Sequence, residues 1–171
     1  MDLPAEFVYN GDVMIETKRC LIRPFIEQDL DDFMTYRNNP EWMRFQSFKG
    51  LTREAYREAL LPEHPIEQGR QLAIVDRALN RLIGDLYIRL DADCYWVGYT
   101  ISPTFARQGY AIETVSALIE TLVQDGATCI KAGVEPANTA SIALLNRLCF
   151  TLESSSDDEL VYRLDFDVED S

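Results

Sequence analysis

The chain has 171 residues, of which 47% are hydrophobic, and this length and composition suit one globular domain spanning 1–171. Its formal net charge of −13 disfavours a nucleic-acid partner, because phosphate backbones are themselves anionic, whereas a cationic amine is compatible with it. No apolar run approaches the roughly 20 residues that span a bilayer, and the acidic N-terminus lacks the features of a signal peptide. We therefore expect a cytoplasmic protein without a nucleic-acid or membrane partner.

The cysteines and the single histidine give little support to a metal site or to a nucleophilic triad. Cys20, Cys94, Cys129 and Cys149 are widely spaced and include no C-x-x-C pair, so we expect buried free thiols. His64 lies between two prolines, which predicts a loop position. No metal cofactor is therefore expected.

The N-terminal half predicts two helices and three strands behind a lead-in of uncertain order at 1–15, where Pro4 and 10–11 are turn signals. We expect a strand at 18–25, followed by a helix that begins at Glu27 and stops at 38–40. A second helix, capped by Thr52, should stop before Pro62 and carry Ala55 and Ala59 on one face. Strands at 71–76 and 82–90 follow.

Residues 95–123 predict a strand, a turn and a helix in direct succession. Aromatic and β-branched residues favour a strand at 95–101, in which Gly98 predicts a bulge or a close backbone approach. Apolar residues recur at helical spacing after a turn that contains Gly109. The first helical turn presents unpaired N–H groups and a favourable dipole to an anion, and Arg107 adds a positive charge. The turn is therefore either a diphosphate cradle or an ordinary connection whose glycine relieves strain.

The C-terminal third predicts a strand, a helix and two further strands. Gly126 suits the end of the long helix, because a left-handed residue commonly terminates a helix. The expected elements are a strand at 129–134, a helix that Asn138 caps and that runs to Leu148, and strands at 150–154 and 160–166 joined by an acidic turn at 155–159. Helices interleaved with hairpin strands indicate a mixed α+β fold.

Two of these segments contain motif residues that resemble a known family. The turn reads Ala106-Arg107-Gln108-Gly109-Tyr110-Ala111, and a later segment, VEPANTASIALLNRLCF, begins its helix with Asn138 and Ser141. Together with 16–33, they resemble the acetyl-CoA-binding halves of the GNAT superfamily of N-acetyltransferases, most nearly the branch that acetylates ribosomal proteins at their N-terminus.

The likeness covers 16–166 and departs from the two cofactor-binding motifs of the family at one position each. Ala106 stands where the family has glutamine or arginine, which removes one side-chain anchor but leaves the backbone cradle in place. Cys149 stands where the family has glycine before the phenylalanine that follows the helix.

The resemblance implies an α+β fold with a mixed, mostly antiparallel central sheet of about six to seven strands flanked by about four helices. It also implies acetyl-CoA as co-substrate and direct transfer of the acetyl group to a primary amine within a ternary complex. The acceptor would be a small molecule or a protein N-terminus, and a homodimer and a longer acyl group both remain open. The alternative is a GNAT-fold module that binds CoA without turnover.

The resemblance also implies which residues form the site. The cofactor-binding residues would be Tyr99, Thr100, Ile101, Arg107, Gln108, Gly109, Tyr110, Ala111, Asn138, Ser141 and Arg147. The acceptor pocket would comprise Trp42, Phe45, Asp85, Tyr87 and Trp96. For the aromatic residues of 41–50, capping the core is an equally good interpretation.

Acid and base catalysts are harder to place. The resemblance puts Gly133 where relatives have a catalytic glutamate and Leu145 where they have a tyrosine. Ser141 is then the candidate that protonates the leaving thiolate, and the alternative is a first-turn residue that only touches the cofactor. Glu135 and Asp85 are the candidate bases for the acceptor amine.

Overall fold

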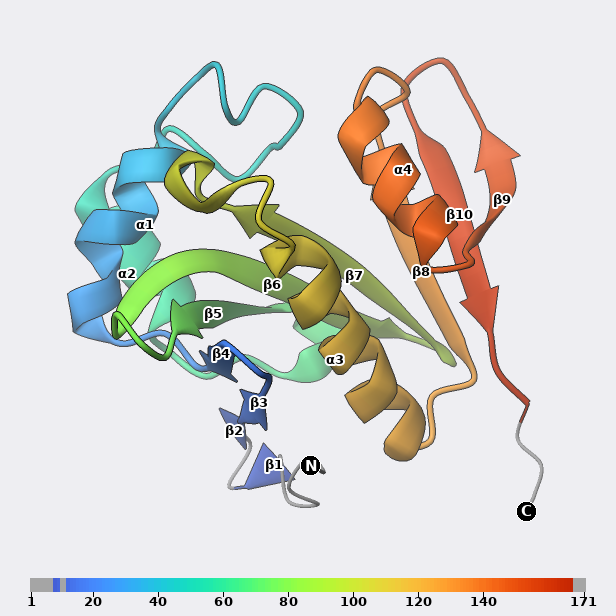
Figure 1. Cartoon of the computed structure of the whole chain (residues 1–171), viewed down its shortest axis with the longest axis horizontal. Coiled ribbons are helices and arrows are strands. Elements are labelled where there is room, and N and C mark those ends of the chain that lie inside the picture. The colour runs from blue at the N-terminus through green and yellow to red at the C-terminus, as the bar shows by residue number, and fades with distance from the viewer. Residues whose placement is uncertain (1–7, 10–11, 168–171) are drawn as a thin grey trace.

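The computed structural model describes residues 8–9 and 12–167, with side chains from Met14 onward, as an eight-stranded sheet and a separate two-stranded ribbon (Figure 1). The order across the sheet is β3-β4-β5-β6-β7-β8-β10-β9, and only β7 and β8 run parallel. The strands are β3 (Ile15–Glu16), β4 (Cys20–Arg23), β5 (Arg70–Asp76), β6 (Arg81–Asp91), β7 (Cys94–Ile101), β8 (Cys129–Val134), β9 (Thr151–Ser155) and β10 (Leu160–Asp165).

This architecture confirms the mixed α+β class, with one strand more in the sheet than expected. The additional strand is β3, which pairs with β4 in a hairpin (Ile15 opposite Ile22), although the sequence placed it in an uncertain lead-in. The ribbon joins β1 (Val8–Tyr9) to β2 (Asp12–Val13). The turn signals expected at Pro4 and 10–11 lie outside the described residues.

The four α-helices are α1 (Leu30–Arg37), α2 (Arg53–Leu60), α3 (Tyr110–Gln124) and α4 (Thr139–Arg147), and none in the described part of the chain is long and apolar enough to cross a membrane. Thr52 caps α2 as predicted, because its hydroxyl accepts a hydrogen bond from the Ala55 N–H at 3.1 Å. The expected apolar face of α2 was wrong. Its buried residues are Tyr56 and Leu60, because the larger side chains gain more from leaving water than the alanines do.

The helices cover the two faces of the sheet and bury a separate core on each (Figure 1). On the face of α3, Leu118 and Leu122 pack in one cluster with Leu72 and Leu86 of the sheet. On the opposite face, α1 and α2 pack against alternate strand residues, and the Phe33 ring lies 5.1 Å, centroid to centroid, from Tyr56. We call these the α3 face and the α1 face of the sheet.

The two parallel strands separate early, and we call this separation the fork. Strands β7 and β8 pair only from Cys94–Cys129 to Trp96–Lys131, and β7 then continues to Ile101 paired with β6 alone. The bulge predicted at Gly98 is wrong, because the β6–β7 register runs without a shift along the whole of β7. The opening in the sheet therefore comes from the divergence of two strands and not from a bulge in one.

The cysteines differ from the expectation of four buried free thiols. Cys94 and Cys129 form a disulfide at the closed end of the fork, because the parallel register brings these residues opposite one another. Cys20 is a buried free thiol, whereas Cys149 is exposed. Among the described residues, no group of three or more His, Cys, Asp and Glu side chains is placed to hold a metal ion.

Candidate active site at the fork

The turn before α3 has the backbone shape of an anion site. Gly109 is the N-cap of α3 with φ +84°, and Arg107 also has a positive φ of +65°. No side chain in the described part of the chain caps the N-terminus of α3, and the turn residues Arg107 and Gln108 are exposed. Backbone N–H groups that converge at a helix N-terminus are ready donors to an anionic group.

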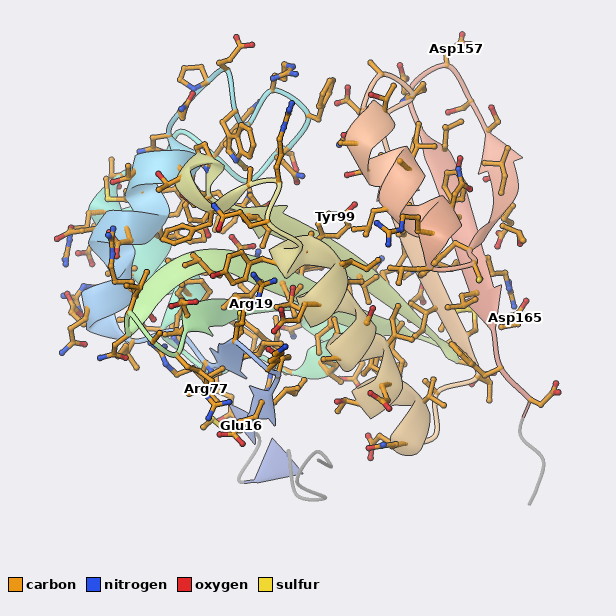
Figure 2. The ribbon with its side chains drawn as sticks, viewed as in Figure 1. Glu16, Arg19, Arg77, Tyr99, Asp157 and Asp165 are labelled. Atoms are coloured by element: carbon orange, nitrogen blue, oxygen red, sulfur yellow. A yellow bond between two sulfur atoms is a disulfide. The ribbon has the colours of Figure 1, made fainter. Side chains whose placement is uncertain are left out.

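A second guanidinium, that of Arg19, lies beside this turn and was not identified from the sequence (Figure 2). A Cβ built on Gly109 would stand 3.4 Å from Arg19 Nη2, and the guanidinium lies 3.9 Å from the centroid of the Tyr110 ring. No sequence signal marks Arg19, because it belongs to a connection some ninety residues earlier, between β3 and β4.

Glu113, in the first turn of α3, holds Arg19 in place. Its carboxylate accepts hydrogen bonds from Thr17 Oγ1 at 2.6 Å, from the Arg19 N–H at 2.8 Å and from Arg19 Nε at 2.7 Å. Burial opposes ionisation of Glu113, but these hydrogen bonds together lower its pKa. Because the Glu113 charge is already compensated, it does not leave an unpaired negative charge at the anion site.

Three of the expected cofactor-binding residues contribute their side chains to the protein interior. The Tyr110 hydroxyl donates to Asp76 Oδ1 at 2.9 Å, so only the backbone of Tyr110 faces the turn. Thr100 is buried, and its hydroxyl accepts a hydrogen bond from Arg37 at 3.3 Å. Ile101 is part of the core on the α3 face. Any role of these residues in cofactor binding is therefore restricted to main-chain groups.

Tyr99 and α4 come together across the open part of the fork (Figure 2). The Tyr99 hydroxyl is buried and has no hydrogen-bond partner among the described residues. Burial raises the pKa of Tyr99 to about 12, and the Ser141 hydroxyl opposes that rise. Asn138 caps α4 as predicted, accepting from the Ser141 N–H at 3.3 Å, while Arg147 is exposed at the other end of the helix.

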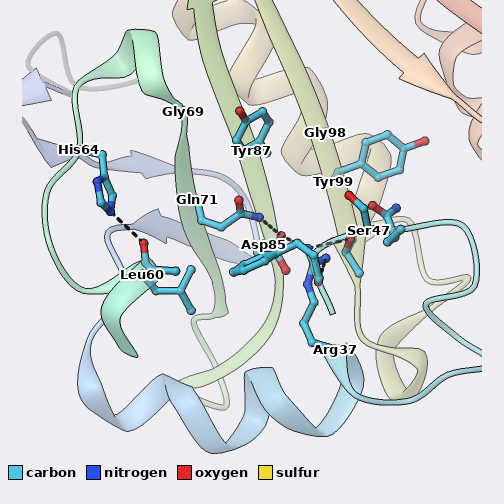
Figure 3. Close-up of a pocket in the computed structure, with 14 residues that line it drawn as sticks. Arg37, Ser47, Leu60, His64, Gly69, Gln71, Asp85, Tyr87, Gly98 and Tyr99 are labelled. Atoms are coloured by element: carbon cyan, nitrogen blue, oxygen red, sulfur yellow. Dashed lines mark hydrogen bonds and ion pairs between the residues drawn. The ribbon is translucent and has the colours of Figure 1, made fainter. Parts of the chain in front are cut away.

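A cavity of about 490 Å³ opens on the α1 face (Figure 3). Asp85 and Tyr87 of β6 line it beside Gly98 and Thr100 of β7. Phe48, one of the aromatic residues of 41–50, is also part of the wall, and the wall residues missed by the sequence analysis include Arg37, Gln46, Ser47, His64 and Gln71. Since β7 contributes to this cavity and also borders the fork, one strand connects the two spaces.

Asp85 is held in a hydrogen-bond network at the cavity and is 1% exposed (Figure 3). It forms an ion pair with Arg37 at 2.7 Å and accepts hydrogen bonds from the Tyr36 hydroxyl at 2.5 Å and from Gln71 Nε2 at 2.9 Å. Burial raises the pKa of Tyr36 well above its usual range, so Tyr36 remains a donor. The arrangement favours a positioning role for Asp85 over proton transfer.

Of the four aromatic residues expected in the acceptor pocket, only Tyr87 lines this cavity, and Trp42, Phe45 and Trp96 lie outside its lining. Trp42 donates from Nε1 to the Ile101 carbonyl at 2.9 Å and packs against the core of the α1 face, which favours its core-capping interpretation. Phe45 lies under its neighbour Arg44, with 4.7 Å from guanidinium carbon to ring centroid. Trp96 is on the α1 face, as the cavity is, but lies nearer the closed end of the fork, where it pairs with Lys131.

The positions that resemblance assigns to acid and base have distinct surroundings. Leu145 is 1% exposed in the core, and Glu135 is an exposed residue just beyond β8. Gly133 has no side chain, but a Cβ built on it would clash with Glu159 Oε2. The carboxylate of Glu159, the residue just before β10, therefore occupies the space beside Gly133. This proximity depends on strand pairing and leaves no local signal in the sequence.

The sequence profile of the acetyltransferase (GNAT) domain matches residues 19–151. No curated protein sequence is significantly similar to the chain.

Solved structures share the fold at low sequence identity. A GNAT-family acetyltransferase from Bacillus anthracis is 18% identical with a TM-score of 0.78, covering 90% of this chain and 98% of its own. RimL, a ribosomal L7/L12 α-N-protein acetyltransferase solved in complex with coenzyme A, has 18% identity, a TM-score of 0.76 and coverages of 91% and 99%. The ribosomal-protein-S5-alanine acetyltransferase from Vibrio fischeri is 18% identical with a TM-score of 0.72, and the match covers 92% of this chain and 98% of that protein.

Replacing Asp85 with alanine should lower the free energy of unfolding by about 3–5 kcal/mol, because it leaves the buried Arg37 guanidinium uncompensated. Denaturant titration of both proteins measures this loss. Asp157→Ala removes an exposed carboxylate instead and should change the value by less than about 0.5 kcal/mol. An Asp85→Ala protein as stable as the wild type would show that this carboxylate is not required by the network.

Proposed function

Because this chain belongs to the GNAT acetyltransferase family, we propose that it transfers an acetyl group from acetyl-CoA to a primary amine, on a protein N-terminus or a small molecule. The observation that carries this proposal is the fork, which opens beside a left-handed turn at the N-terminus of α3. An acyl donor that reaches the fork from the α3 face would meet an amine that enters from the cavity on the α1 face.

The donor side fits the two ends of acetyl-CoA. Its diphosphate suits the uncapped N–H groups at the start of α3, and Arg107 supplies positive charge beside them, whereas the nearby Arg19 is paired with Glu113. When bound, acetyl-CoA supplies the acyl group as an activated thioester. Residues 97–101 of β7 lack a β8 partner, so their outward main-chain N–H groups can donate to the oxyanion that develops on the acyl carbonyl.

The acceptor side is the cavity of the α1 face. The network around Asp85 fixes the cavity residues that border β7, and a fixed wall orients an acceptor without further ordering. A protein N-terminus is the preferred acceptor, supported by the resemblance to the ribosomal-protein branch and by two neighbours whose names specify ribosomal proteins. The chain's net charge of −13 is compatible with a cationic acceptor.

The alternative function is a module that binds CoA but does not catalyse transfer. Release of free CoA in the presence of excess amine separates the two functions. We would screen peptide N-termini, polyamines and aminoglycosides as acceptors. Product with any of them supports the transferase, whereas acetyl-CoA binding without product from the whole panel supports the module.

Ser141 is the proposed proton donor to the leaving thiolate. It lies in the first turn of α4, its N–H donates to the cap residue Asn138, and its hydroxyl neighbours Tyr99 at the fork. The high pKa of Tyr99 keeps that phenol protonated at neutral pH, so it can donate a hydrogen bond to the same region. Glu135 remains a candidate base, exposed at the end of the β8 arm.

Gly109→Val should weaken acetyl-CoA binding more than Arg107→Ala, because the valine adds a β-branched side chain at φ +84° within the proposed cradle, whereas the alanine removes one charge only. Saturation at 100 times the dissociation constant should stabilise the wild type by about 2.7 kcal/mol. Thermal unfolding across an acetyl-CoA series measures both affinities.

The matched control is Gly126→Val, which imposes comparable backbone strain at φ +101° beyond the far end of α3. It should lower stability without changing acetyl-CoA affinity. Equal binding by the Gly109 and Arg107 variants would contradict the cradle. A wild-type melting temperature unmoved by millimolar acetyl-CoA would contradict the proposed function itself.

Ser141→Ala should lower kcat while leaving acetyl-CoA affinity nearly intact, if the hydroxyl protonates the thiolate. Loss of a general acid costs on the order of a hundredfold or more, but a thiol of pKa about 8.5 leaves readily, so we expect the low end of that range. Steady-state kinetics on an acceptor from the screen measure the change. Unchanged kcat would identify solvent as the proton source.

A further inference from the structure

The fork has one level at which neither strand carries a side chain on the α1 face. Strands β7 and β8 pair at a constant offset, and the last pair joins Trp96 and Lys131. Continued by two residues, that offset would set Gly98 opposite Gly133. Gly98 already lines the cavity of the α1 face. Gly98 therefore leaves the β7 side of this level free of a side chain where the cavity borders the fork.

Strand alternation puts Gly133 on the α1 face with the cavity. Lys131, two residues earlier, has its Nζ 5.6 Å from the centroid of the Trp96 ring. The intervening Ala132 and the following Val134 are buried in the core of the α3 face. Because side chains alternate between faces along a strand, the missing side chain of Gly133 would point to the α1 face.

The Glu159 carboxylate occupies the space that Gly133 leaves empty. Glu159 Oε2 is the atom nearest to a Cβ built on Gly133, and the rest of the carboxyl group is next nearest. The backbone of Glu159 is fixed by the β9–β10 turn. Its N–H donates to Ser156 Oγ at 3.1 Å, and its carbonyl accepts from the Ser156 N–H at 2.9 Å. Glu159 is thus a carboxylate on an anchored backbone beside the fork.

The oxygens of this carboxylate are not engaged by another described side chain. Within the described part of the chain, the Glu159 side chain makes no hydrogen bond or ion pair. The basic residues of the same region are already engaged, since Lys131 and Arg163 both pair with Glu153, at 3.2 and 3.4 Å. The remaining charged groups around it are acidic: Asp157 and Asp158 in its own turn and Glu135 beyond β8.

We infer that Glu159 is the general base that deprotonates the acceptor amine, an inference that rests on the proposed acetyltransferase function. A carboxylate oxygen takes one proton from the acceptor ammonium, and the nitrogen lone pair then attacks the acetyl carbonyl carbon. As the C–N bond forms and the C–S bond breaks, the nitrogen loses a second proton, and the departing thiolate gains one. Glu159 returns its proton to solvent, so the products are the amide, the free thiol of CoA and one proton.

The other carboxylates near the site are less suited to this step. Asp85 is buried and accepts hydrogen bonds from Tyr36, Arg37 and Gln71, which occupy both of its oxygens. Glu135, which is exposed as Glu159 is, lies beyond the last paired residue of β8 and so farther along the diverging arm. Glu159 is the carboxylate that a Cβ built on Gly133 would meet.

The test begins with Glu159→Gln, which keeps the shape of the side chain and removes its basicity. With an acceptor from the screen, kcat should fall on the order of a hundredfold or more, while acetyl-CoA affinity stays unchanged. The defect should shrink as pH rises past about 8, because an α-amine is then neutral without help. Asp157→Asn, which removes one charge from the tip of the same turn (Figure 2), should leave kcat within twofold of the wild type.

A double variant tests whether a carboxylate supplied from another residue to the same space can replace that of Glu159. Gly133→Glu combined with Glu159→Ala supplies a carboxylate to the same space from β8 and should recover at least tenfold of the lost kcat. Gly133→Ala alone should lower kcat, since its methyl group would displace the Glu159 carboxylate.

The outcomes separate this inference from the proposed function. An active wild type with an equally active Glu159→Gln variant overturns the inference and leaves the acetyltransferase intact. The same holds if Glu135→Gln, and not Glu159→Gln, shows the large defect. A wild type that binds acetyl-CoA but acetylates none of the amines refutes both.

Discussion

The site depends on a parallel strand pair that ends after three residue pairs. Parallel neighbours normally continue along a sheet, because each further pair satisfies backbone groups that would otherwise need another partner. Here β7 leaves its β8-facing edge open from Val97 onward, while β6 holds its other edge in unbroken register. The open edge of β7 thus presents N–H groups that have no strand partner, while pairing with β6 along the opposite edge holds the strand in place. Rigid, unpaired N–H groups are what stabilisation of a developing oxyanion requires.

The remaining elements hold β7 and β8 apart at the fork, and each face of the sheet contributes a different part of the candidate site. On the α3 face, the Glu113–Arg19 ion pair ties the start of α3 to the β3–β4 connection. On the α1 face, the Arg37–Asp85 pair ties α1 to β6 beneath the cavity. The partly exposed Glu113–Arg19 pair and the buried Arg37–Asp85 pair thus lie on opposite faces of the sheet.

Local features of the sequence predicted most of the fold but only part of the site. The strand at 129–134 and the caps at Thr52 and Asn138 depend on neighbouring residues, and each was predicted correctly. The Cys94–Cys129 pair depends on strand register, which no short segment encodes. The same holds for Arg19 beside Gly109 and for Glu159 beside Gly133, where residues distant in sequence meet. Sequence reasoning identified a missing side chain at Gly133 and could not identify what fills its place.

The most direct test of the central claim, that the fork and its adjoining turn bind acetyl-CoA, is amide hydrogen exchange with and without the cofactor. Exchange reports opening and protection of individual backbone groups. We predict that acetyl-CoA slows exchange at 97–101 of β7 and at 109–113 of the first turn of α3, with little change in α1 and α2. Protection confined to the second cavity, between Ile119 of α3 and Leu164 of β10, would contradict the account, as would no protection at all.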